Sequence, residues 1–123
     1  MYDSMQDLHN TLTEERDLLK KLIKSLQECN RRLADAEQTY RKRYTAACIR
    51  IKLDGIEGKK GKTEPVAWTM TGELARGIQG VASARHERDV LKGEKEAILQ
   101  KIYQTKIEID LLTKEMEAIR RGE

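Results

Sequence analysis

Residues 5–36, MQDLHNTLTEERDLLKKLIKSLQECNRRLADA, decide the fold of this 123-residue chain. Apolar side chains return every seven residues in this stretch, in two series that are offset by three residues. The first series is Met5, Leu12, Leu19, Leu26 and Leu33, and the second is Leu8, Glu15, Leu22, Cys29 and Ala36, in which Glu15 is the one charged member. These are the a and d positions of a coiled coil, so the stretch predicts a long helix that buries one narrow stripe.

The predicted helix covers residues 3–54, a range that contains neither glycine nor proline and is rich in strong helix formers. Asp3 or Ser4 can cap its start, because a short polar side chain accepts hydrogen bonds from free N–H groups of the first turn. Gly55 or Gly58 can end it, because glycine adopts the left-handed conformation that terminates helices.

A second heptad pattern predicts a helix over residues 71–121, after a loop over residues 55–70. Its two apolar series contain Leu74, Val81, Ile102, Ile109 and Met116, and Ala84, Leu91, Ile98, Leu112 and Ile119. Thr69 or Thr71 can cap this helix. Three glycines among its first ten residues weaken its beginning, so order there must come from packing.

The two stripes fit one another if the chain folds back on itself. Residues whose numbers sum to 124 then face each other, as in Leu12–Leu112, Leu33–Leu91 and Leu8–Met116. We therefore predict an all-α fold, an antiparallel two-helix coiled-coil hairpin that forms a single domain over residues 1–123. An extended dimer, in which helices of different chains share the seam, would use the same heptads.

Four apolar residues lie off the seam in one row: Leu99, Tyr103, Ile107 and Leu111. Single apolar residues on a surface are normal, but a two-helix hairpin has no third layer to cover such a row. We expect these residues to form an oligomer interface that joins two hairpins into a homodimeric four-helix bundle. A different protein as the partner is the alternative.

The composition limits the possible classes of protein. The chain is 37% charged, 38% hydrophobic and 4% aromatic, which favours long helices over a broad core. It contains no run of about 18 apolar residues, so no membrane span is predicted. Residues 1–10 lack the basic and apolar blocks of a secretory signal, and Cys29 and Cys48 are too few for a disulfide framework. We expect a cytoplasmic protein.

Positive charge is concentrated between residues 41 and 62, where the net charge is +6, against −3 for the rest of the chain. The basic residues are Arg41, Lys42, Arg43, Arg50, Lys52, Lys59, Lys60 and Lys62. Such a cluster can bind the phosphates of DNA or RNA, with Tyr40, Tyr44 or Trp68 stacking on bases. The alternative is a solvated, lysine-rich loop. A short strand over residues 49–53, paired with residues 66–68, is an alternative for this segment, which Pro65 and the glycines would make unstable on its own.

Two stretches of the sequence resemble enzyme motifs, but neither stretch matches its motif completely. GIEGKKGKT at residues 55–63 resembles the phosphate-binding loop GxxxxGK[ST], but five residues instead of four separate Gly55 from Gly61. HERDV at residues 86–90 begins like the zinc-binding helix HExxH, but Val90 stands where the second histidine is needed. We predict that the protein is not an enzyme and that it holds no cofactor or metal.

Three stretches carry a resemblance: YRKRYTAACIRIKL at residues 40–53, KTEPVAWTMT at 62–71 and YQTKIEIDLLTKEMEAIRRGE at 103–123. Their layout resembles small coiled-coil hairpin proteins encoded by bacteriophages and prophages. The resemblance implies the cytoplasm of a host cell and an accessory role, either in nucleic-acid transactions or as an adaptor or inhibitor that binds a host protein. A structural spacer is the third function that we consider.

Overall fold

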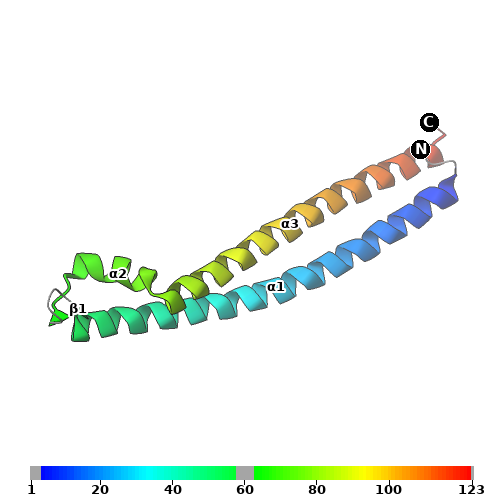
Figure 1. The fold of residues 1–123 in the computed structure, drawn as a ribbon. Helices are drawn as coiled ribbons and strands as arrows, with labels where there is room; N and C mark the ends of the chain where they lie inside the picture. Colours follow the sequence, from blue (N-terminus) through cyan, green and yellow to red (C-terminus); the bar gives the residue numbers. More distant parts are fainter. Residues whose placement is uncertain (1–3, 58–62, 123) are drawn as a thin grey trace. The chain divides into compact units, whose positions relative to one another are not determined.

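The computed structural model describes residues 4–57 and 63–122, and these residues are almost entirely helical (Figure 1). The elements in chain order are α1 (Met5–Asp54), β1 (Ile56–Glu57), β2 (Thr63–Glu64), α2 (Trp68–Gly77) and α3 (Gln79–Arg120). The predicted all-α class is confirmed. No helix within the described ranges is long and apolar enough to cross a lipid bilayer.

Helix α1 begins and ends at two of the predicted capping residues. The backbone N–H of Asp7 donates a hydrogen bond of 3.1 Å to Ser4 Oγ, so Ser4 caps the first turn. Gly55 has a positive φ of 70°, and its N–H donates to the carbonyl oxygen of Ile51 at 2.9 Å. The left-handed conformation of Gly55 therefore ends the helix.

The chain divides into two compact units, and the first combines residues up to Asn30 with residues from Gly93 onward. In this unit the start of α1 lies antiparallel to the end of α3 (Figure 1). The core contains buried Leu8, Leu12 and Leu112, with Ile109 and Met116 packed against them. Leu12 and Leu112, and Leu8 and Met116, are pairs that the heptad register predicts.

The second unit covers Arg31–Lys92 and contains two apolar clusters. One cluster is formed by Leu33, Ala36 and Leu91, and it includes the predicted pair Leu33–Leu91. The other joins α1 to the returning chain through Ala47, Ile51, Val66, Ala75 and Val81. Tyr44, Cys48 and Leu74 pack against this second cluster.

The predicted helix over residues 71–121 is two helices in the structure. Helix α2 ends at Gly77, and the extended backbone of Ile78 (φ −69°, ψ 131°) separates it from α3. The carbonyl oxygen of Ile78 then accepts hydrogen bonds from the N–H groups of Val81 and Ala82, which starts α3. Glycines 77 and 80 flank the break, and glycine is the least favourable helix residue after proline.

The segment before α2 also differs from the expectations. Helix α2 begins at Trp68, so the connection is shorter than the predicted loop over residues 55–70. Its N-cap residue is Ala67, without a side-chain cap, and Thr71 Oγ instead donates to the carbonyl oxygen of Ala67 at 3.0 Å. The alternative of a strand over residues 49–53 is wrong, and the predicted helix is right there, because these residues belong to α1.

A short antiparallel pairing does occur in the connection. It joins β1 to β2, with Ile56 opposite Glu64 and Glu57 opposite Thr63. The pairing holds the two ends of the connection between α1 and α2 together, and with two residues on each strand it is too short to form an extended sheet.

Candidate nucleic-acid interface

The predicted basic residues of α1 lie on two flanks of the helix. Arg43 and Arg50 line a shallow hollow together with the start of α3, whereas Arg41 and Lys42 line another beside Thr45 and Ile49. These four side chains are exposed, and Lys52 is half-buried. The remaining predicted residues, Lys59, Lys60 and Lys62, lie outside the described residues.

Arg43 and Arg50 each have a partner within the chain. Arg43 Nη1 donates a hydrogen bond of 3.2 Å to the carbonyl oxygen of Gly80, near the start of α3. Arg50 Nε lies 3.9 Å from Asp54 Oδ2, one turn away on the same exposed helix surface. Arg43 thus helps to join α1 to α3, and the charge of Arg50 is partly compensated.

Lys52 and Trp68 form the most distinctive contact of this region. The amino group of Lys52 lies 4.4 Å from the centroid of the indole ring, a cation–π geometry. The same amino group donates to the carbonyl oxygen of Val66, just before α2. Trp68 itself is 76% exposed. Lys52 therefore fixes one side of an indole that is otherwise open to solvent.

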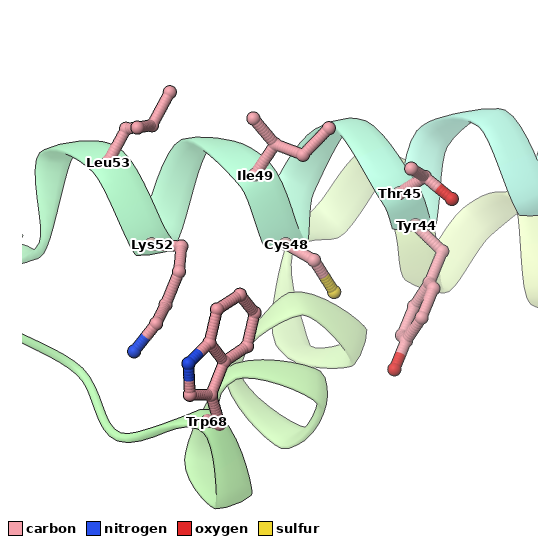
Figure 2. Close-up of a pocket in the computed structure, with 7 residues that line it drawn as sticks. All are labelled: Tyr44, Thr45, Cys48, Ile49, Lys52, Leu53 and Trp68. Atoms are coloured by element: carbon pink, nitrogen blue, oxygen red, sulfur yellow. The ribbon is translucent and has the colours of Figure 1, made fainter.

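A groove of about 390 Å³ surrounds this contact. It is lined by Tyr44, Thr45, Cys48, Ile49, Lys52, Leu53 and Trp68. Figure 2 shows the indole of Trp68 between the side chains of Lys52 and Cys48, below α1. Ile49 and Leu53 project from the opposite side of α1 in this view, and Leu53 is 80% exposed. Exposed apolar surface therefore extends around this end of α1.

Tyr40 and Tyr44, which were predicted to stack on bases, contact other residues of the second unit instead. The rings of Tyr40 and Tyr44 stack with centroids 6.0 Å apart and planes 15° apart. The guanidinium carbon of Arg88 lies 4.6 Å from the centroid of Tyr40. Arg88 also donates two hydrogen bonds, of 3.1 and 3.0 Å, to Asp89 Oδ1, which lower the pKa of Asp89. Trp68 is thus the exposed member of the three predicted aromatic residues.

Tyr44 of α1 also lies very close to the backbone of α2, at Gly72. A Cβ atom built on Gly72 would lie only 2.6 Å from Tyr44 Oη, so glycine permits the two helices to come this close. A hydrogen bond with Cys48 raises the pKa of Tyr44 above its usual value, and the electrostatic interaction with the Cys48 side chain acts in the same direction.

The predicted oligomer interface is exposed in the first unit. The exposed fractions are 38% for Leu99, 68% for Tyr103, 49% for Ile107 and 57% for Leu111. These four residues follow one another on α3 at intervals of four, and they form a continuous apolar row. The row has no cover among the described residues, as the sequence predicts.

Sequence reasoning missed the exposed apolar residues near Trp68. Ile49, Leu53 and Met70 are all exposed in the structure. For Ile49 and Leu53 the available signal was a position off the heptad seam, but the alternation of Ile49, Ile51 and Leu53 also suggested a strand. Met70 falls in the predicted loop, where the heptads give no signal.

Comparison with protein-family models, with curated proteins and with solved structures finds no match to this chain. Within residues 4–57 and 63–122, no group of three or more His, Cys, Asp or Glu side chains is arranged to hold a metal ion.

Proposed function

We propose that the protein is a non-catalytic accessory protein that self-associates through α3 and binds single-stranded nucleic acid beside Trp68. The observation that supports nucleic-acid binding best is the exposed indole of Trp68 with the amino group of Lys52 over it. An accessible aromatic ring beside positive charge is the usual combination of proteins that bind single strands.

Arg41 extends this surface along α1. It precedes Lys52 by 11 residues, which is close to three helical turns, so both side chains leave the same side of the helix. Their backbone positions are ~16 Å apart along the axis. Phosphates of a strand stacked on Trp68 can therefore contact Lys52 and Arg41, with Lys42 further around the helix.

The test uses the single tryptophan of the chain as a reporter. A dye-labelled oligothymidine is titrated with the protein, and anisotropy and indole fluorescence are recorded at several salt concentrations. We expect quenching of Trp68 and an affinity that falls as salt increases, because phosphate binding releases counterions. Trp68→Ala should weaken binding by roughly 5- to 150-fold, which corresponds to ~1–3 kcal/mol for one stacked base.

A matched pair of variants separates local contacts from net charge. Arg41→Glu combined with Lys42→Glu should weaken binding strongly, because both side chains are exposed near the groove. Lys20→Glu combined with Lys24→Glu changes the net charge equally at exposed positions of the first unit. Equal losses for the two pairs, or binding that is insensitive to salt, would contradict this proposal.

Protein binding is the second candidate function, and the apolar surface around the groove favours it. Leu53 and Trp68 are both more than three-quarters exposed, and tryptophan is often the anchor of a protein interface. On this proposal the protein is an adaptor or inhibitor of a host protein. Leu53→Ser distinguishes the two functions, because it removes the apolar side chain without changing the charge: it should abolish capture of a protein partner and leave oligonucleotide binding nearly unchanged.

A role as a structural spacer needs neither surface. The phage-like layout of the sequence is compatible with all three roles, in the cytoplasm of a host cell.

A further inference from the structure

The apolar row on α3 has charged and polar residues at its ends and along its edges. Glu96 precedes the row, Lys114 follows it, and Gln100 and Asp110 lie beside it, all four exposed. A hollow of about 480 Å³ lies next to Tyr103. Its lining consists of Glu96, Leu99, Gln100, Ile102, Tyr103 and Lys106. The face is therefore an apolar strip with a shallow depression and distinct charges at either end.

We infer that this face binds α3 of a second copy of the chain, antiparallel, about a two-fold axis at the level of Thr105. Residues whose numbers sum to 210 then face each other across the axis. This inference rests on the self-association in the proposed function, and it adds the partner helix, its direction and its register. A two-fold axis makes each contact occur twice, so a self-complementary face is required.

The apolar residues match in this register. Leu99 faces Leu111 of the second copy, and Tyr103 faces its Ile107. The symmetry repeats both pairs, so that four apolar layers cover the exposed row on each copy. The hollow beside Tyr103 then lies against the apolar side chains of the other α3.

The charges match as well. Glu96 faces Lys114 of the second copy, and Gln100 faces its Asp110, so each end of the strip pairs a carboxylate or amide with a complementary group. Within one chain, Lys114 Nζ already lies 3.1 Å from Asp110 Oδ2. This ion pair places the ammonium group at the edge of the apolar row, where Glu96 of the second copy would arrive.

Other arrangements of the same row set like charges against each other or an apolar residue against a charge. In a parallel pair, Glu96, Lys106 and Lys114 would each face their own copies. An antiparallel pair shifted by one turn, with sums of 206, would set Glu96 against Asp110 and Lys92 against Lys114. The opposite shift, with sums of 214, would set Leu99 against Glu115. Charge patterns of this kind select one register by disfavouring the others.

A charge-swap experiment tests the register. Dimerisation of the full chain is measured by analytical ultracentrifugation at low salt for Glu96→Lys, for Lys114→Glu and for the double variant. Each single variant creates two like-charge pairs, so we expect the dimer to weaken roughly 5- to 30-fold, from about 0.5–1 kcal/mol per exposed pair. The double variant restores opposite charges across the axis and should recover most of the affinity.

Spin-label distances test the direction of the helices independently of charge. Labels are placed at Gln104 or Glu117 after both native cysteines have been replaced by alanine. For helices ~10 Å apart, the antiparallel register predicts ~10 Å between backbone positions 104 and ~37 Å between positions 117. A parallel pair would give similar short distances at both sites.

The results distinguish a failure of self-association from a failure of the antiparallel register. A chain that stays monomeric at every concentration overturns the proposed self-association and this register with it. A dimer in which the double variant stays as weak as the single variants, or in which both label distances are short, overturns the register alone. Nucleic-acid binding beside Trp68 is measured separately and is unaffected by either result.

Discussion

Replacement of Gly72 by alanine should destabilise the protein only when the hydroxyl group of Tyr44 is present. The new Cβ atom would lie 2.6 Å from Tyr44 Oη, which is closer than two such atoms can approach, but 3.7 Å from Cζ, which is ordinary contact. The ring stacks on Tyr40 and packs against the cluster that contains Ala47 and Ala75, and these contacts oppose its moving away. The clash therefore falls on one oxygen atom, which a second substitution removes.

The magnitude follows from two opposing effects. Overpacking typically costs about 1–3 kcal/mol, whereas alanine in place of glycine within a helix stabilises by about 1 kcal/mol. Gly72→Ala alone should thus lower the free energy of unfolding by about 0–2 kcal/mol. In the Tyr44→Phe background the clash is absent, so the same change should raise it by up to ~1 kcal/mol.

Urea denaturation followed by circular dichroism at 222 nm measures all four members of this double-mutant cycle. Gly93→Ala is the matched control, because a Cβ atom there would meet nothing within 4 Å. It should stabilise α3 by the same amount in both backgrounds. If Gly72→Ala also stabilises equally in both backgrounds, the close approach of Tyr44 to α2 is refuted.

Three further predictions concern other parts of the chain. The raised pKa of Tyr44 means that folding favours its neutral form, so the stability that it contributes is complete below about pH 10 and is lost as the pH rises further. In urea titrations at increasing pH, the free energy of unfolding of Tyr44→Phe should therefore fall less above pH 10 than that of the unchanged protein. Ser4→Ala removes the acceptor for the N–H of Asp7 and should lower the free energy of unfolding by ~0.5–2 kcal/mol, and an unchanged urea midpoint would contradict the cap. Ile107→Asp should prevent dimerisation in ultracentrifugation while the helical circular dichroism signal is retained, because Ile107 is exposed within one chain.

Much of the helical packing could be predicted from the heptads. Leu12, Leu33, Leu91 and Leu112 are buried as the two series require. The pattern succeeds here because a narrow seam between two helices accepts apolar residues only at fixed intervals.

The pattern fails near the connection, where α2 replaces a continuous second helix. Extended at the same spacing beyond Ala36, the second series would reach Arg43 and Arg50, which are exposed. The apolar pattern of the sequence drifts near the loop to Tyr40, Tyr44, Ala47 or Cys48, and Ile51, and Ala47 and Ile51 are buried, as is Thr71 outside either series. A seven-residue repeat assumes a partner helix that continues straight. The break at Ile78 changes the partner, so the buried face of α1 shifts there.

For the candidate nucleic-acid interface, the sequence predicts which types of residue take part but not how they are arranged. The sequence indicates a basic region with three nearby aromatic residues, but it does not show that Tyr40 and Tyr44 stack on each other while Trp68 is exposed. That difference depends on where α2 begins, and Ala67 offers no side-chain cap as a signal. It also depends on the contact of Lys52 with Trp68, which joins residues 16 positions apart.

The extended residue Ile78 has a consequence for motion as well as for packing. It leaves α2 as a separate helix of 10 residues, a length that is marginal in water without tertiary support. Only Thr71 and Ala75 of α2 are buried, so few contacts oppose its opening. Amide hydrogens of α2 should therefore exchange with solvent faster than those in the middle of α1, and a ligand stacked on Trp68 should slow that exchange.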